Sequence, residues 1–325
     1  MDSLVRRGSE VNRTVLRQRG IKLIHGDVRA VSDLESVPRC DWIIDAAANP
    51  SVVAGVTGQT SSRQLLEHNL IGTINLLELA RGWQSGFLML STSRVYSVRQ
   101  LSDLPVKTDG IRFTPAEAAS QIPGFSAQGV AELFSTEPPL SLYGSSKRAS
   151  EILVCEFAEA FHLPAFIDRC GVLAGAGQFG KADQGIFSFW IHAWREGRPL
   201  QYLGFSGTGC QVRDCLHPRD LLPLIGKQLQ ASSVSSPRIL NVSGGLSLSA
   251  SLRQLSQWCE QRFGPRQVEA ESQARRFDVP WLVLDSTPAR KAWSWGPAMS
   301  LETIWSEIAD HAERHPDWLD QVADG

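Results

Sequence analysis

Short apolar runs alternate with longer segments of helical period through the first half of this 325-residue chain. The apolar runs cover residues 22–24, 42–47, 87–91 and 165–169. Between them, residues 61–82 and 145–161 place apolar side chains three and four positions apart. Strands that are apolar on both faces and that alternate with amphipathic helices are typical of a parallel sheet covered by helices on both sides. We therefore expect an α/β fold with a doubly wound parallel sheet.

The charge balance and the length of the apolar runs exclude several classes of partner. The chain has 32 basic and 34 acidic residues, and the basic ones are spread along it. We therefore expect no nucleic-acid partner. Every apolar run is far shorter than the roughly 20 residues that a membrane span needs, and the first residues are polar. We expect no membrane partner, no signal peptide and a cytoplasmic location.

The cysteines give no sign of a metal site. Six cysteines lie far apart, without a CxxC pair or a Cys/His cluster. That spacing disfavours both a zinc site and a disulfide framework, so we expect reduced thiols and no metal.

A Tyr-x-x-x-Lys motif is the sharpest chemical feature. Tyr143 and Lys147 are four residues apart at the start of the predicted helix 145–161, which places them on one helix face. A cation beside a phenol favours its ionised form, which gives a base that works near neutral pH. Thr92 follows the predicted strand 87–91, and ligands of doubly wound sheets bind where strands end. We predict that Thr92, Tyr143 and Lys147 are catalytic; the alternative is a surface tyrosine beside a solvated lysine.

Several further motifs accompany these residues. They are Ser-Thr-Ser-Arg-Val-Tyr at 91–96, Asn-Leu-Ile-Gly-Thr-Ile-Asn-Leu at 69–76, Arg-Cys-Gly-Val at 169–172, Asp-Gln-Gly at 183–185 and Gly-Cys-Gln-Val-Arg-Asp at 209–214. With these motifs the chain resembles the extended short-chain dehydrogenase/reductases, the NAD-dependent epimerase/dehydratase family, from Asp2 to about Pro297. Within that family it is most similar to the CDP-paratose (CDP-tyvelose) 2-epimerase branch.

The resemblance implies a Rossmann-like fold of two domains. Residues 1–170 would form the NAD-binding domain and residues 171–325 mainly a smaller substrate domain, with residues 207–245 returning to the first. In the family, a strand, a glycine-rich turn, a helix and a second strand precede the residue that matches Asp2. We therefore expect an N-terminally truncated sheet and weak binding of NAD, because that turn holds the cofactor's pyrophosphate.

The resemblance also assigns binding residues. For NAD it implies Asp2 at the adenosine ribose, Asp27 and Val28 at the adenine, Ala46 and Ala47 along the pyrophosphate and ribose, Asn69 supporting the strand ends, and Tyr143 and Lys147. For the substrate, a nucleotide-diphosphate sugar, it implies Gln184 and Arg213. A guanidinium suits a diphosphate because it donates paired hydrogen bonds to phosphate oxygens. The alternative for Arg213 is an ion pair with Asp214 or Asp220.

The implied function is NAD-dependent epimerisation of a nucleotide sugar. The leading hypothesis is a CDP-sugar 2-epimerase that oxidises the sugar transiently to a keto sugar and reduces it again, with Tyr143 as acid and base, Lys147 tuning its pKa and Thr92 positioning the hydroxyl. The alternatives are a 4-epimerase or reductase of the same superfamily, or a non-catalytic nucleotide-binding remnant. Ser93 and Arg94 replace the Asp-Glu pair of the 4,6-dehydratases, which disfavours dehydration. A homodimer through the helices at residues 61–82 and 145–161 is a further expectation.

Overall fold

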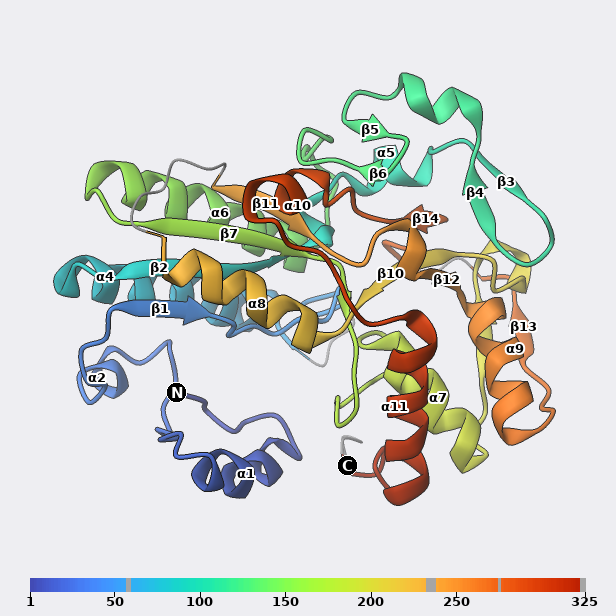
Figure 1. Ribbon diagram of the computed structural model, residues 1–325, viewed down its shortest axis with the longest axis horizontal. Helices are drawn as coiled ribbons and strands as arrows, with labels where there is room; N and C mark the ends of the chain where they lie inside the picture. The colour runs from blue at the N-terminus through green and yellow to red at the C-terminus, as the bar shows by residue number, and fades with distance from the viewer. Residues whose placement is uncertain (57–59, 232–237, 274–275, 322–325) are drawn as a thin grey trace.

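A four-stranded parallel sheet lies at the centre of the first half of the chain (Figure 1). The computed structural model describes residues 1–56, 60–231, 238–273 and 276–321. The sheet has the order β1-β2-β7-β11, with β1 at Trp42–Asp45, β2 at Gly86–Thr92, β7 at Ala165–Cys170 and β11 at Ile239–Val242. These strands confirm the predicted parallel sheet.

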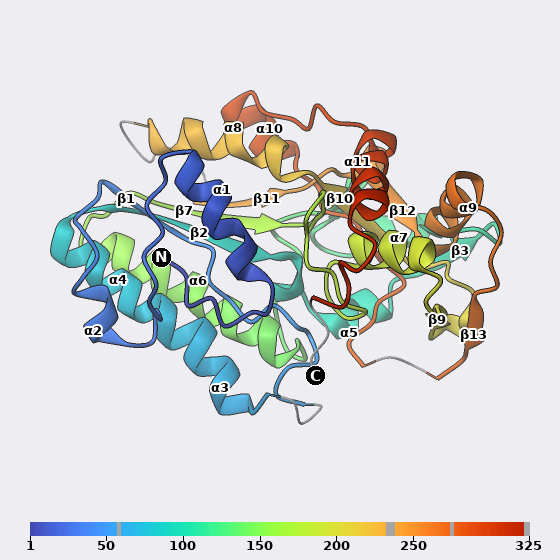
Figure 2. The same ribbon diagram turned by 90° about the horizontal axis from the view of Figure 1, so that it is seen from below.

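Helices cover both faces of this sheet (Figure 2). On one face lie α3 (Ser62–Leu66), the π-helical η2 (Glu67–Ile71), α4 (Gly72–Trp83) and α6 (Leu142–Ala160). On the other lie α8 (Pro218–Leu229) and α10 (Thr287–Trp293). Successive residues of β2 point to opposite faces, so Phe87 joins the core with Leu76 and Val154, whereas Leu88 joins the core with Leu224. The double coverage explains why these strands are apolar on both sides.

The segment that precedes β1 departs from the prediction. Residues 22–24 do not form a strand; the pairing there is an isolated parallel bridge between Asp2 and His25. The prediction was wrong because this apolar run has only that one-residue pairing, so β1 is an edge strand of the four-stranded sheet. The surrounding chain forms η1 (Ser9–Val11), α1 (Asn12–Gln18) and α2 (Val31–Leu34).

A second group of elements follows residue 170. β10 (Val212–Leu216) pairs with β8 (Val172–Leu173), β12 (Ser249–Ser251) and β14 (Trp281–Leu282). Beside this sheet, α7 (Ile186–Glu196), α9 (Leu252–Phe263) and α11 (Leu301–Arg314) share an aromatic core. The chain crosses between the two groups more than once, because β11 belongs to the first sheet and α8 packs against that sheet. The domain boundary at residue 170 stays a prediction.

Short elements complete the fold. They are η3 (Ser93–Val95), α5 (Val98–Ser102), β3 (Val106–Thr108), β4 (Phe113–Pro115), η4 (Glu117–Gln121), β5 (Phe125–Ser126), β6 (Gly129–Val130), β9 (Gln201–Leu203), η5 (Phe205–Gly207), η6 (Leu246–Leu248) and β13 (Glu269–Glu271).

The core beneath α8 and α10 provides a test of this packing. Phe166 is fully buried, with its ring centroid 6.0 Å from that of Trp42 and 5.4 Å from that of Trp293. We expect Phe166→Ala to lower the free energy of unfolding by about 3–5 kcal/mol, because it leaves a cavity between two indoles. Urea unfolding measures this, with Leu133→Ala, at an 88% exposed side chain, as the control. Equal stability of the two variants would contradict the packing.

Candidate active site

The carboxyl end of β2 and the first turn of α6 bring Thr92 and Tyr143 together. Thr92 is the last residue of β2, Tyr143 is the second residue of α6, and both line a cavity of about 370 Å³. The Thr92 hydroxyl oxygen accepts the backbone N–H of Arg94 at 3.2 Å. The same hydroxyl group also forms a hydrogen bond with the Tyr143 phenol.

A glycine allows this approach of helix to strand. The Ser141 hydroxyl caps α6 by accepting the N–H of Gly144 at 3.0 Å. A Cβ atom on Gly144 would lie 2.2 Å from the carbonyl oxygen of Arg94, far inside contact distance. The backbone of α6 thus lies directly against the turn that follows Thr92, and no side chain fits between them.

Burial dominates the electrostatics of the site. It raises the pKa of the Tyr143 phenol, while the hydrogen bond with Thr92 and the charge of Arg94 act in the opposite direction. Lys147, one helical turn further along α6, is only 2% exposed, and no carboxylate of the described segments forms an ion pair with it. A buried cation without a counter-ion is costly. Two partners would offset this cost. They are the hydroxyl groups of a ligand and the phenolate form of Tyr143.

Four of the eight residues predicted to bind NAD surround a second cavity. Asp2, Val28, Ala46 and Ala47 line a space of about 540 Å³ that runs along β1 and past its carboxyl end, together with apolar side chains. Asp27, which was predicted to lie at the adenine with Val28, directs its carboxylate to Arg29 at 2.6 Å. Hydrogen bonds from Arg29 lower the pKa of the Asp27 carboxyl. The structure thus brings four of these residues together around one space.

Asn69 has a different place from the other predicted residues. It is completely buried in η2, where its amide nitrogen donates to the Asn49 carbonyl and to the Ser146 hydroxyl, each at 3.1 Å. Its side-chain oxygen accepts the N–H of Asn49 at 2.7 Å. Asn69 therefore connects the chain after β1 to α6, and its role near the cofactor stays a prediction.

The predicted substrate residues line the first cavity with Thr92 and Tyr143. Gln184 and Arg213 both reach it, from different segments of the chain. Arg213 forms an ion pair with Asp278 at 2.5 Å, a partner that the expected alternatives Asp214 and Asp220 did not include. The carboxylates of those two residues accept backbone N–H groups, from residue 284 and from residues 298 and 299 respectively.

Residues that sequence reasoning missed complete the wall of this cavity. Asp278 and Phe277 lie in no motif, and Phe277 has a φ of 61°, which non-glycine residues rarely adopt. The guanidinium of Arg94 donates to the Phe277 carbonyl at 3.2 Å. Arg94 belongs to the motif at 91–96, so the sequence could have indicated that it lies in the site. The position of Asp278 in the site depends on the tertiary structure and could not be predicted from a motif.

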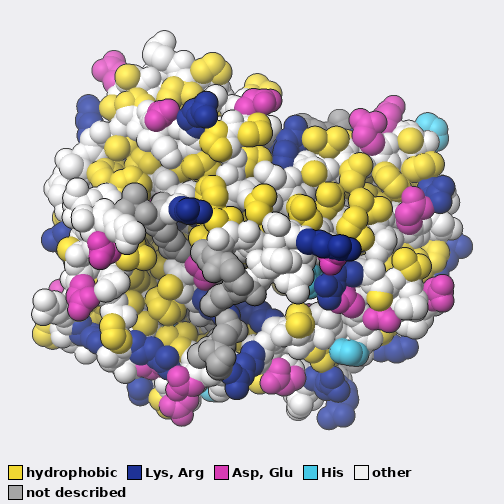
Figure 3. Space-filling view, turned by 180° about the vertical axis from the view of Figure 1, so that it is seen from behind, with side chains coloured by type: hydrophobic (Ala, Val, Ile, Leu, Met, Phe, Trp, Pro, Cys, Tyr) yellow, Lys and Arg dark blue, Asp and Glu magenta, His cyan; other side chains and the backbone are white. Residues whose placement is uncertain are grey.

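Outside the two cavities, the described residues show no disulfide, metal site or membrane-spanning helix. All six cysteines have free thiols, and basic and acidic side chains lie interspersed on the face in Figure 3. No group of three or more His, Cys, Asp or Glu side chains in the described part of the chain could hold a metal ion. Among the same residues, no helix combines the length and apolar character needed to cross a bilayer.

Comparison with known proteins gives consistent matches. The model of the NAD dependent epimerase/dehydratase family matches residues 2–243. The chain is 25% identical to the CDP-paratose 2-epimerase of Salmonella typhi over 99% of this chain and 91% of that protein. It is 26% identical to the UDP-glucose 4-epimerase of Mycoplasma pneumoniae, with coverage of 86% and 81%. A crystal structure of UDP-glucuronic acid 4-epimerase from Bacillus cereus superposes with a TM-score of 0.74 at 19% identity, covering 96% of this chain and 90% of that one.

Gly144 provides a test of the close approach. We expect Gly144→Ala to lower the free energy of unfolding by about 1–3 kcal/mol, because the methyl group collides with a backbone oxygen. Turnover should fall roughly 100-fold, since Tyr143 moves with the helix. The matched control is Gly82→Ala in α4, where an added Cβ meets no atom within 4 Å. Urea unfolding and steady-state kinetics measure both effects, and wild-type values for Gly144→Ala would refute the contact.

Proposed function

The chain belongs to the NAD dependent epimerase/dehydratase family, and on that basis we propose that it epimerises a nucleotide-activated sugar. The observation that carries the proposal is one cavity lined by Thr92, Tyr143 and Arg213, with the buried Lys147 on the same helix. A hydroxyl, a phenol and a guanidinium around one space fit a ligand with an alcohol at one end and a phosphate at the other. A nucleotide-diphosphate sugar has both groups.

The family is NAD-dependent, and the residues present fit the adenosine half of that cofactor. The second cavity has apolar walls for a planar base, and the Asp2 carboxylate at its edge can accept ribose hydroxyls. The small side chains of Ala46 and Ala47 leave room for the chain of atoms that leads toward Thr92. In this proposal Lys147 binds the ribose next to the nicotinamide. When bound, NAD supplies a reversible acceptor for a hydride from the sugar carbon.

The protein's own groups then handle the proton. Thr92 donates a hydrogen bond that orients the sugar hydroxyl, and Tyr143 as phenolate removes the proton from that hydroxyl. Lys147 stabilises the phenolate, because a nearby cation favours the charged form of a phenol. After the keto sugar has turned over in the cavity, Tyr143 returns the proton. The diphosphate stays on Arg213, so the sugar can turn without leaving the site.

The choice of sugar carbon follows from the relatives rather than from the geometry. We propose 2-epimerisation of a CDP-sugar first, because the Salmonella typhi CDP-paratose 2-epimerase matches almost the full chain. The second candidate is 4-epimerisation, which the Mycoplasma pneumoniae relative and the Bacillus cereus structure favour. A non-catalytic nucleotide-binding remnant is the third. The buried Lys147 argues against it, since a buried cation that has no ion-pair partner in the described part of the chain is costly and gives a binding scaffold no benefit.

A homodimer through the helices of one face remains part of the proposal, as does a cytoplasmic location. Leu66 in α3, Ile71 in η2 and Ile152 in α6 are 37%, 42% and 47% exposed, although all three are apolar. Apolar side chains on adjacent helices are typical of a helical dimer interface.

Proton NMR of nucleotide sugars provides the functional test. We expect a CDP-sugar, incubated with the protein and NAD in deuterated water, to form its epimer without deuterium at the inverted carbon, because the same hydride returns to it. Parallel incubations with UDP-glucose and UDP-glucuronic acid test the 4-epimerase candidate. Tyr143→Phe should abolish the conversion while nucleotide binding persists. Deuterium at the inverted carbon would contradict transient oxidation, and no conversion of any sugar would favour the remnant.

The pH dependence tests the electrostatics of Tyr143. Because the charge of Arg94 lowers the pKa of the Tyr143 phenol, Arg94→Gln should raise that pKa. The phenolate is the active base, so the acidic limb of the kcat/KM profile should move to higher pH. Arg99→Gln, at an exposed arginine in α5, is the matched control and should keep the wild-type limb. A shift in the opposite direction would show that Tyr143 is not the titrating base.

A further inference from the structure

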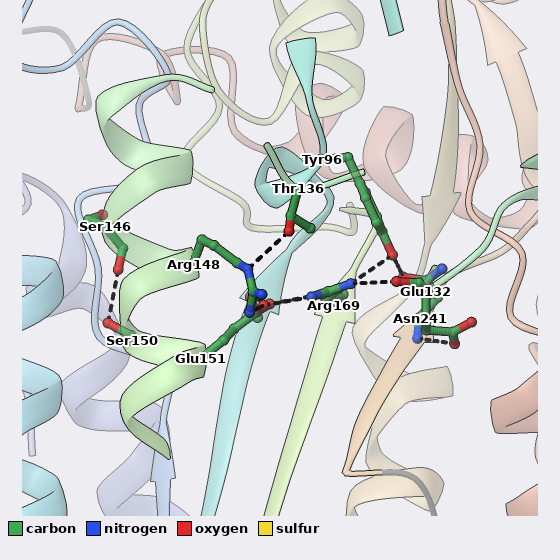
Figure 4. Close-up of polar contacts among 10 residues, drawn as sticks. Tyr96, Glu132, Thr136, Ser146, Arg148, Ser150, Glu151, Arg169 and Asn241 are labelled. Carbon is green, nitrogen blue, oxygen red and sulfur yellow. Dashed lines mark hydrogen bonds and ion pairs between the residues drawn. The ribbon is translucent and has the colours of Figure 1, made fainter. Parts of the chain in front are cut away.

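A buried ion pair joins the catalytic helix to the sheet (Figure 4). Glu151 in α6 is fully buried and Arg169 in β7 is 3% exposed. The guanidinium donates two parallel hydrogen bonds, from Nε to Oε1 at 2.9 Å and from Nη2 to Oε2 at 2.7 Å. Arg148 adds a third contact to Oε2 at 3.3 Å. A bidentate pair at this depth fixes both orientation and distance, because neither charge can leave its partner without an unpaired charge remaining.

Glu151 lies on the same face of α6 as Tyr143 and Lys147. Tyr143, Lys147 and Glu151 follow one another at intervals of four along α6, which places them in one row. Glu151 does not line the cavity that holds Tyr143. Any effect of Glu151 on catalysis must therefore act through the placement of other groups.

Two connections run from this pair to the two flanks of Thr92. On one side, the Ser91 hydroxyl donates to Oε1 of Glu151 at 2.6 Å. On the other, Nη1 of Arg169 donates to the Tyr96 hydroxyl at 3.2 Å, and the guanidinium lies 5.1 Å from the centroid of the Tyr96 ring. The residue before Thr92 and the first residue after the turn η3 are thus held by one pair of charges.

The Tyr96 end is itself anchored. The Tyr96 hydroxyl donates to Oδ1 of Asn241 in β11 at 2.6 Å, and Oε1 of Glu132 accepts the backbone N–H of Asn241 at 2.8 Å. Burial raises the pKa of Tyr96 to about 12, so its hydroxyl keeps its proton and remains a donor over the working pH range. The connection from the pair to the turn after Thr92 is therefore rigid at both ends.

We propose that the Glu151–Arg169 ion pair is a positioning element that sets the distance between Thr92 and Tyr143. Glu151 is part of the same helix as Tyr143. The contacts of the pair with Ser91 and Tyr96 hold the segment that contains Thr92. The inference rests on the proposed function for its meaning in catalysis, but the geometry it describes exists without substrate. Misplacement of reacting groups by about 1 Å can cost a factor of roughly 100 in rate, so such a device matters.

The test releases Thr92 while Glu151 and Arg169 keep their bidentate pairing. The double variant Ser91→Ala/Tyr96→Phe removes both hydroxyls and leaves Glu151 paired with Arg169. The readout is the NMR signal of tyrosine labelled with ¹³C at Cζ, recorded at neutral pH, where it reports the hydrogen bonding of the phenol. The chain has three tyrosines, so the Tyr143 signal is easily assigned with Tyr143→Phe. Thr92→Val, which removes the partner hydroxyl itself, gives the reference shift.

We expect the Tyr143 signal of the double variant to move most of the way to its position in Thr92→Val. The matched control is Ser150→Ala, which removes a fully buried hydroxyl from the same helix with no connection to Ser91 or Tyr96. Its signal should coincide with the wild type. A wild-type signal in the double variant, or an equal displacement in the control, would overturn the proposal.

Kinetics separate this inference from the proposed function. In the double variant, kcat should fall about 10- to 100-fold with KM for the nucleotide sugar unchanged, since the diphosphate contact is untouched. Equal loss in kcat and gain in KM would indicate general disruption and count against positioning. If the wild type turns over no sugar at all, the proposed function fails, while the NMR comparison still decides whether the pair holds Thr92 against Tyr143.

Discussion

The contact between the first turn of α6 and the turn after β2 is the constraint on which the site depends. At Gly144 the helix backbone lies so close to the Arg94 carbonyl that a single methyl group would overlap it. The contact places a phenol from a helix beside a hydroxyl from a strand end, and it encloses Lys147 at 2% exposure. Burial then raises the pKa of Tyr143, and the hydrogen bond with Thr92 and the charge of Arg94 act in the opposite direction. The contact between α6 and the turn after β2 therefore determines how deeply Tyr143 is buried and in which direction its pKa moves.

The parallel sheet explains why both cavities lie where they do. The first contains Thr92 at the end of β2, and the second contains Ala46 and Ala47 just after β1. Strands of one parallel sheet end at the same edge, so residues that follow neighbouring strands gather there. Asn69 connects this edge to α6, through Asn49 on one side and Ser146 on the other. The same edge thus carries the proposed cofactor and substrate sites.

The sequence predicted the features that depend on local pattern. The strands at 42–47, 87–91 and 165–169 and the helix containing Tyr143 were recognisable from periodicity, and the spacing of Tyr143 and Lys147 placed both on α6. The run at 22–24 failed as a strand because periodicity does not reveal whether a neighbouring strand pairs with it.

Contacts between residues far apart in the sequence could not be predicted from the sequence alone. Arg213 forms an ion pair with Asp278, 65 residues further along the chain, which the sequence did not indicate. The Glu151–Arg169 pair lies across 18 residues and needs the register of β2 beside β7, which pairs Ser91 with Arg169. Local spacing contains no information on that register, so the positioning pair became visible only in the fold.

Calorimetric titration with NAD tests the central claim most directly, namely that the buried Lys147 and its helix form a cofactor-dependent catalytic site. We predict weak but saturable binding of one NAD per chain, about tenfold weaker again in Lys147→Met and nearly unchanged in Thr92→Val, because Lys147 binds the cofactor whereas Thr92 contacts the sugar. Binding that is absent in the wild type, or that is indifferent to Lys147→Met, would contradict it.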